Sequence, residues 1–163
     1  MNQLPSFEDE LVALLPRLRR FAHSLSRSPA DADDLTQATV ERAIRSSGQW
    51  TPGTRLDSWL YRIMRNLWID TARSRARKQA FEAPPEEAAG VGDRDGIEES
   101  LELARIMAAM QRLPDEQREV VSLILIEGFG YREAAELLDL PIGTVSSRLV
   151  RGRTALLVMV GER

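Results

Sequence analysis

Cysteine is absent from this chain of 163 residues, and histidine occurs once, at His23. Without cysteine, disulfide bonds, thiolate zinc sites and cysteine nucleophiles are excluded, and a reducing cytoplasm is the compatible compartment. A single histidine without partner ligands does not make a metal site. The sequence also offers no serine, histidine and aspartate arrangement and no phosphate-binding loop. We therefore predict that the protein is not an enzyme and has no catalytic residues, no metal and no cofactor.

Long apolar runs are missing as well. No stretch of about 20 apolar residues, the length that crosses a bilayer, occurs in the sequence. The opening segment MNQLPSFEDE has no basic region followed by an apolar run, so it does not resemble a secretion signal. With 43% hydrophobic and 29% charged residues, the composition is that of an ordinary soluble protein. We expect a cytoplasmic protein that does not insert into a membrane.

Charge is distributed unevenly, although the formal net charge is only -3. Between Arg42 and Lys78, nine arginine and lysine residues stand against two acids. Between Gln79 and Glu102, eight acids stand against Arg94 alone. Because the two blocks cancel in the total, the small net charge hides a basic segment suited to nucleic acid.

The acidic block includes a segment without apolar periodicity, residues 79–100. Its sequence, QAFEAPPEEAAGVGDRDGIEES, combines adjacent prolines, glycines and clustered acids, which is typical of a flexible linker. The acids can serve solvation and extension of the linker by self-repulsion, or they can imitate nucleic acid electrostatically. The linker predicts two domains, residues 1–78 and 101–163.

Helical periodicity fills the first domain. Apolar residues repeat about every 3.6 positions between Leu11 and Leu25, and Ser28 with Pro29 forms the start signal of a second helix. Residues 46–54 (SSGQWTPGT) interrupt the pattern and predict a loop. The strongest helix follows, with an apolar stripe at Leu56, Trp59, Leu60, Ile63, Met64 and Leu67.

The second domain has the same helical character. A helix that starts near Pro114 is expected to end at Gly128 and Gly130 and to bury four residues, Val120, Val121, Ile124 and Leu125. Residues 131–138 predict a short helix and residues 139–141 a turn. The final helix is expected to bury Val145, Leu149, Gly152 and Leu156. Because no segment predicts a convincing strand, the fold class is all-α, with two small helical domains joined by the acidic linker.

The helices from about residue 131 to residue 153 have the spacing of a helix-turn-helix. The second of them has small and charged outward side chains, which suit the major groove of duplex DNA, about 12 Å wide. Arginine pairs with guanine edges or phosphate, and hydroxyl groups with either. A solvated amphipathic helix in a bundle has the same spacing, so that alternative stays open. The candidate DNA contacts are Thr144, Ser147, Arg148 and Arg151, with Ser146 and Arg153 beside them.

The basic helix and the loop before it form a second constellation. Arginines beside aromatic rings suit single-stranded nucleic acid, because bases stack on rings while guanidinium groups follow the phosphates. The nearby aromatic residues include Tyr61 and Trp68, as well as Trp59, which we assign to the core. For Trp50, core anchoring and nucleic-acid contact both stay open. The polar residues that fall mainly outside the apolar stripe are Arg62, Arg65, Asn66, Asp70 and Arg73.

Four segments carry a resemblance that the spacing could not supply. They are DADDLTQATVERA, PGTRLDSWLYRIMRNLWIDTARSRAR, LPDEQREVVSL and GFGYREAAELLDLPIGTVSSRLVRGR. In this order, over nearly the whole chain, they resemble a bacterial RNA polymerase sigma factor of the extracytoplasmic-function type. The resemblance implies a transcription initiation factor, with a region 2-like domain at residues 1–78 and a region 4-like helix-turn-helix domain at residues 101–163.

The resemblance also implies what each set of residues binds. The clamp coiled coil of the largest polymerase subunit would receive Asp31, Asp33, Asp34, Leu35 and Gln37. The -10 element would be recognised and melted by Gln49, Trp50, Arg55, Arg62, Arg65, Asn66, Asp70 and Arg73. The -35 element would be bound as duplex by Thr144, Ser146, Ser147, Arg148, Arg151 and Arg153. The polymerase flap region and an anti-sigma protein would be further partners, in a stress response.

The chain departs from the family pattern at four positions. Ala38 replaces an acid, Ser146 a basic residue, Gly130 a helix-capping serine and Gly152 an alanine. Serine at position 146 removes about one phosphate contact. Glycine inside a helix costs roughly 0.5–1 kcal/mol relative to alanine.

Two other functions fit parts of the pattern. A sigma-like decoy would keep the fold but bind an anti-sigma protein in place of DNA, and the retained Arg148, Arg151 and Arg153 argue against it. A stand-alone helix-turn-helix regulator would leave the acidic and basic helices of the first domain without a purpose.

Overall fold

The computed structural model describes residues 3–79 and 99–161. Within these ranges all regular structure is helical and there are no strands, which confirms the all-α fold. Contacts between residues divide the chain into two compact units, residues 1–88 and 89–163. Most of the predicted linker at residues 79–100 lies outside the described residues, and its described ends, Gln79, Glu99 and Ser100, are helical.

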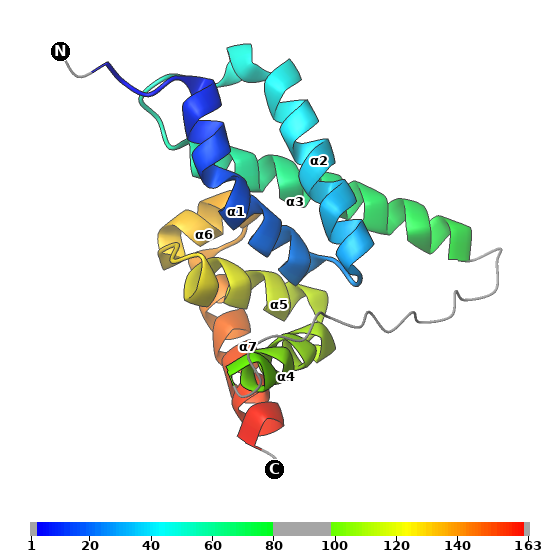
Figure 1. Ribbon diagram of the computed structural model, residues 1–163. Coiled ribbons are helices and arrows are strands. Elements are labelled where there is room, and N and C mark those ends of the chain that lie inside the picture. Colours follow the sequence, from blue (N-terminus) through cyan, green and yellow to red (C-terminus); the bar gives the residue numbers. More distant parts are fainter. Residues whose placement is uncertain (1–2, 80–98, 162–163) are drawn as a thin grey trace. The chain divides into compact units, whose positions relative to one another are not determined.

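Three helices form the first unit: α1 (Phe7–Leu25), α2 (Pro29–Arg45) and α3 (Leu56–Gln79), each in contact with the other two (Figure 1). The predicted start of α2 is confirmed, because the Ser28 side chain accepts the N–H of Asp31 at 3.1 Å and Pro29 stands in the first turn. A short 3₁₀ helix, η1 (Ser47–Gln49), lies in the loop between α2 and α3.

Tyr61 lies at the centre of this bundle. Its side chain is 0% exposed, its ring centroid lies 4.7 Å from that of Phe21, and the guanidinium of Arg17 lies 5.6 Å from its ring centroid. Three members of the predicted apolar stripe are buried, Leu56, Leu60 and Met64. The other three, Trp59, Ile63 and Leu67, are half-buried. Tyr61, one of the aromatic residues near the arginines in the sequence, belongs to the core, because α3 packs against two helices and buries a wider arc than one stripe.

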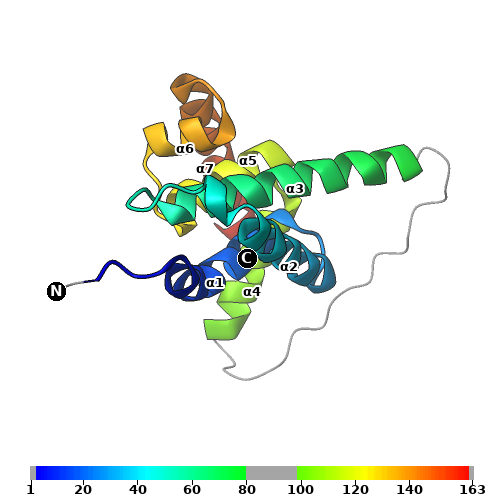
Figure 2. The ribbon, with the colours of Figure 1, turned by 90° about the horizontal axis from the view of Figure 1, so that it is seen from above.

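The last turns of α3 extend past its two neighbours. This helix has 24 residues, and Figures 1 and 2 both show its C-terminal half projecting beyond α1 and α2. Its exposed charged residues after Asp70 are all basic and include Arg73, Arg77 and Lys78. The projecting part of α3 therefore presents positive charge to solvent.

The second unit is built around its last helix, α7 (Ile142–Gly161), which contacts three others: α4 (Glu99–Arg112), α5 (Asp115–Val121) and α6 (Tyr131–Leu138). The predicted inward residues Val145, Leu149 and Gly152 are buried. Gly130 precedes α6 without a side-chain cap, as its replacement of a serine implies. The apolar side of α7 thus holds this unit together.

One inward residue of the second unit was predicted wrongly. Leu125 is 51% exposed, whereas Leu123 is buried with Val120 and Val121. A π-helical turn, η2 (Ser122–Ile126), follows α5. In such a turn the hydrogen bonds join residues five apart, so the 3.6-residue phase that pointed to Leu125 does not continue through it.

Gly152 lies on α7 close against α5. A Cβ added to Gly152 would lie 2.7 Å from Val121 Cγ2 and 3.4 Å from Gln117 Cβ. Val121 is a buried, β-branched side chain with little freedom to move. The departure from the alanine usual in the family therefore has a packing reason.

We expect Gly152→Ala to destabilise the second unit by about 1–2 kcal/mol. Overpacking costs about 1–3 kcal/mol, and the gain in helix propensity of roughly 0.5–1 kcal/mol offsets only part of it. Urea unfolding followed by circular dichroism measures the change in free energy of unfolding. The matched control is Gly143→Ala in the same helix, since nothing lies within 4 Å of its added Cβ. A Gly152→Ala protein as stable as the wild type would contradict the close approach of α5 and α7.

Candidate nucleic-acid interface

A tight turn joins α6 to α7 and completes the predicted helix-turn-helix. Asp139 adopts the left-handed conformation with a φ of 53°, which aspartate tolerates better than most residues. The N–H of Leu140 donates to the carbonyl of Ala135 at 3.0 Å. The carbonyl of Pro141 accepts the N–H of Thr144 at 3.0 Å in the first turn of α7. These bonds fix the direction in which α7 leaves the turn.

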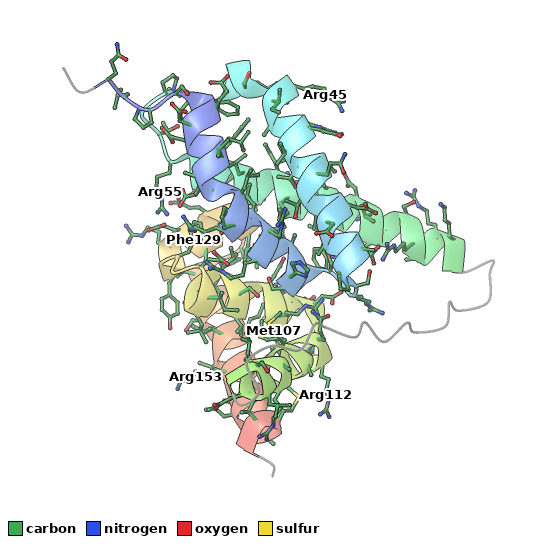
Figure 3. All side chains as sticks on the ribbon, viewed as in Figure 1. Arg45, Arg55, Met107, Arg112, Phe129 and Arg153 are labelled. Carbon is green, nitrogen blue, oxygen red and sulfur yellow. The ribbon has the colours of Figure 1, made fainter. Side chains whose placement is uncertain are left out.

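The predicted duplex contacts lie on the outward side of α7. Thr144, Ser147, Arg148 and Arg151 recur at helical spacing, and Figure 3 shows the flanking Arg153 extending away from the helix. Thr144 and Arg148 are half-buried, and the exposed members of the set are Ser146, Ser147, Arg151 and Arg153. The Ser147 hydroxyl donates to the carbonyl of Thr144 at 3.2 Å. The structure brings all six residues onto one helix, with arginine and hydroxyl groups facing solvent.

Arg148 is paired with an acid that was not among the predicted site residues. Its Nη2 lies 3.5 Å from Oε2 of Glu116, in the first turn of α5. The Glu116 side chain is 71% exposed, so solvent screens the pair and it adds little stability. The ion pair instead limits where the guanidinium can lie. Only the crossing of α5 and α7 brings these residues together, which is why the sequence could not reveal them.

The polar face of α3 agrees with the sequence prediction. Arg62, Asn66, Asp70 and Arg73 are exposed on successive turns, and Arg65 is half-buried. All lie off the apolar stripe that packs into the bundle. The helix therefore presents both cationic groups and hydrogen-bonding groups along one side.

The loop before α3 is held by its own hydrogen bonds. Thr54 donates twice to the carbonyl of Thr51, from its N–H at 3.2 Å and from its hydroxyl at 2.6 Å. Gln49 is exposed, whereas Trp50 is half-buried with its ring 5.7 Å from that of Phe7. One ring face of Trp50 is thus used by the protein itself.

Arg55, at the end of this loop, is oriented by a neighbouring carboxylate. Its Nε and Nη2 donate to the carboxylate of Asp57 at 3.1 and 2.9 Å. The same carboxylate accepts the N–H of Ser58 at 2.7 Å and Nη1 of Arg17 at 3.4 Å. Burial of Asp57 raises its pKa, but these donors and the charges of Arg55 and Arg17 together hold the pKa below its ordinary value. Asp57 therefore stays ionised at neutral pH and keeps Arg55 in place.

The acidic face of α2 is only partly free. Asp33, Asp34 and Gln37 are exposed, whereas Leu35 is 7% exposed and lies beneath this surface. Asp31 accepts two hydrogen bonds from the guanidinium of Arg75 on α3, one of them at 2.9 Å. Of the five residues predicted to bind polymerase, three are thus displayed and two are engaged inside the unit.

The same ion pair shifts the pKa of both partners. The hydrogen bonds from Arg75 are the main cause that holds the pKa of Asp31 below its ordinary value, and the hydrogen bonds to Asp31 raise the pKa of Arg75. The pair joins the acidic helix to the basic helix. The pairing was not predicted from the sequence, because it depends on the packing of α2 against α3.

Two kinds of site are missing from the described part of the chain. No group of three or more histidine, cysteine, aspartate or glutamate side chains there could hold a metal ion. None of the helices described is long and apolar enough to span a bilayer.

A three-helix unit that ends in a basic helix, followed by a helix-turn-helix unit, places the chain among helical DNA-binding proteins. The family model of Sigma-70 region 2 matches residues 11–78, and that of Sigma-70 region 4 matches residues 103–156. The chain belongs to the extracytoplasmic-function sigma factors, so it is a transcription initiation factor and not an enzyme. The resemblance found in the sequence is confirmed.

Relatives support the same family. The chain is 37% identical over 151 residues to the sigma factor EcfG of Rhodopseudomonas palustris, covering 93% of this chain and 83% of the relative. It is 39% identical over 158 residues to SigE of Mycolicibacterium smegmatis, covering 94% of this chain and 61% of the relative. Among solved structures, the sigma factor RpoE in complex with the anti-sigma factor NepR from Bartonella quintana has a TM-score of 0.86 at 34% identity, covering 96% of this chain and 98% of that one.

We expect the pair of Asp31 with Arg75 to stabilise the fold at neutral pH but not in acid. The pKa of Asp31 is lower in the folded protein than in the unfolded chain, where it is about 3.9. The contribution of the pair to the free energy of unfolding is therefore complete above the unfolded pKa and is lost as pH falls through the folded pKa. Asp31→Asn should lower the free energy of unfolding by at most about 1 kcal/mol at pH 7, since the pair is partly exposed. Urea unfolding at a series of pH values measures the difference from wild type, which should shrink below about pH 4. The exposed Asp33→Asn is the control, and a difference for Asp31→Asn that is independent of pH would contradict the assignment.

Proposed function

We propose that this sigma factor directs core RNA polymerase to promoters by binding the -35 element as duplex on α7. The observation that carries the proposal is the outward side of α7, where Thr144, Ser147, Arg148 and Arg151 share one face above a buried stripe. A helix of this kind fits the major groove, where arginine reads guanine and hydroxyl groups reach bases or phosphates. Ser146 and Arg153 would add flanking contacts.

The -10 element is assigned to the first unit. Arg62, Arg65 and Arg73 on α3 would attract the phosphates of the melted strand, while Asn66 and Asp70 offer hydrogen-bonding groups to base edges. In the loop, Gln49, Trp50 and Arg55 would receive an unstacked base. The exposure of α3 along this side and the fixed loop before it support the proposal.

Polymerase binding is assigned to the acidic face of α2. Asp33, Asp34 and Gln37 are exposed there and would meet the clamp coiled coil of the largest subunit. Asp31 and Leu35 would act from within, because Arg75 holds Asp31 and the core holds Leu35. The second unit would contact the flap region.

An anti-sigma protein is the remaining partner we infer. Among similar structures, RpoE is in complex with the anti-sigma factor NepR, and CnrH is in complex with the cytosolic domain of CnrY, the latter with a TM-score of 0.66 at 26% identity. Such a protein would cover the surfaces that face polymerase. The factor would then act in the cytoplasm, as part of a stress response, once released.

The proposal is tested by transcription in vitro. Core polymerase from the source bacterium, mixed with this chain, is expected to initiate at a limited set of sites in a genomic DNA library. Mapping of RNA 5′ ends identifies those sites, and core polymerase without the chain is the control. A holoenzyme that forms but initiates no more specifically than the core alone would favour the sigma-like decoy.

Arg148→Ala should weaken binding of the holoenzyme to a -35 duplex by roughly 5- to 140-fold, because one bidentate base contact is worth about 1–3 kcal/mol. Fluorescence anisotropy with labelled duplex from a mapped promoter measures the loss, while affinity for core polymerase should stay unchanged. Arg112→Ala is the matched control, because Arg112 is an exposed arginine on α4 (Figure 3). If Arg148→Ala instead abolished binding to core polymerase, α7 would be assigned to the wrong partner.

A further inference from the structure

Phe7 joins three elements of the first unit, although it lies outside the matched sigma-70 segments. It is the first residue of α1, whereas the region 2 match begins at residue 11. Its ring centroid lies 5.7 Å from that of Trp50, in the loop, and 6.3 Å from that of Trp59, on α3. The interplanar angles are 51° and 71°, tilted and edge-to-face arrangements of the kind that aromatic rings prefer.

The position of Phe7 is set by the start of its helix. The Ser6 side chain accepts the N–H of Asp9 at 3.1 Å, and the Ser6 carbonyl accepts the N–H of Glu10 at 3.0 Å. These bonds close the first turn of α1. The ring of Phe7 is therefore presented from a formed helix.

The Trp50 side chain has no hydrogen bond within the described part of the chain that would hold it in its place, although the Trp50 backbone N–H donates to the Ser47 carbonyl at 3.2 Å. Its Nε1 is buried and lacks a hydrogen-bond partner among the residues described. An unpaired buried N–H opposes burial of the indole. Packing of the ring against Phe7, with centroids 5.7 Å apart, favours its burial. The neighbouring Gln49, Thr51 and Thr54 are exposed, so the loop turns its polar side to solvent while Trp50 points inward.

We propose that Phe7 is a positioning residue for recognition of the -10 element. By anchoring Trp50, it holds the loop in one conformation before DNA arrives, so less conformational freedom is lost when the loop captures an unstacked base. This inference rests on the proposed function of the loop. It adds a residue of the N-terminal helix that would touch neither DNA nor polymerase.

The experiment uses holoenzyme and the non-template single strand of a -10 region mapped with the wild-type factor. Phe7→Ala is expected to weaken binding of this labelled oligonucleotide by roughly 2- to 10-fold, the range that follows from loss of an aromatic pair. Phe7→Tyr should restore it. Val12→Ala is the matched control, because Val12 lies on the same helix and is 64% exposed. Affinities for core polymerase and for the -35 duplex should not change in any variant.

Hydrogen exchange separates positioning from general stability. In Phe7→Ala, the amides of Trp50 and Thr54, which are bonded to Ser47 and Thr51, should exchange faster, while those of α2 should not. If Phe7→Ala unfolds the first unit, Phe7→Leu keeps apolar volume without the ring and should show the same loss of binding.

The outcomes distinguish this inference from the function on which it rests. Wild-type holoenzyme that does not retain the oligonucleotide would overturn the proposed -10 function and the inference with it. The inference alone would be overturned if wild-type and Phe7→Ala holoenzymes bound the oligonucleotide equally well and the loop amides of Phe7→Ala exchanged as slowly as those of the wild type. Reduced retention that Phe7→Tyr restores, with faster exchange confined to the loop, supports it.

Discussion

The burial of one side of each long helix is the constraint on which the other features of this protein depend. In the first unit, α3 faces the core with Leu60, Tyr61 and Met64. In the second unit, α7 faces the core with Val145 and Leu149. Once these sides are buried, the rotation of each helix about its axis is set. The outward residues then follow from helical spacing alone. The candidate DNA-binding surfaces are the sides that packing leaves free.

Ion pairs refine those surfaces and contribute little to stability. Arg75 holds Asp31, Asp57 holds Arg55, and Glu116 contacts Arg148. Each pair restrains the head group of a residue that was predicted to bind polymerase or DNA. Partly exposed pairs are worth about 0–1 kcal/mol. Their main effect is to set the direction of a charge and to reduce how much of it is free for a partner.

Local patterns in the sequence predicted the helices well, and long-range packing accounts for what they missed. The Ser28 cap, the stripe from Leu56 to Met64 and the turn at Asp139 all depend on residues a few positions apart. Leu125 was misplaced because a π-helical turn interrupts the helical phase. The burial of Tyr61 was not predicted, because nothing local indicates that α3 packs against two helices.

The all-α class, the helix-turn-helix, the uneven charge and membership of the sigma-factor family could be predicted from the sequence, because periodicity, capping and motifs act over short distances. Which predicted residues are exposed and which are held by neighbours depends on tertiary packing. It buried Leu35, tied Asp31 to Arg75, set Phe7 against Trp50, and required glycine at position 152. Each of these depends on tertiary packing, between two helices or, for Phe7 and Trp50, between a helix and a loop, and such packing brings together residues that lie far apart in the chain.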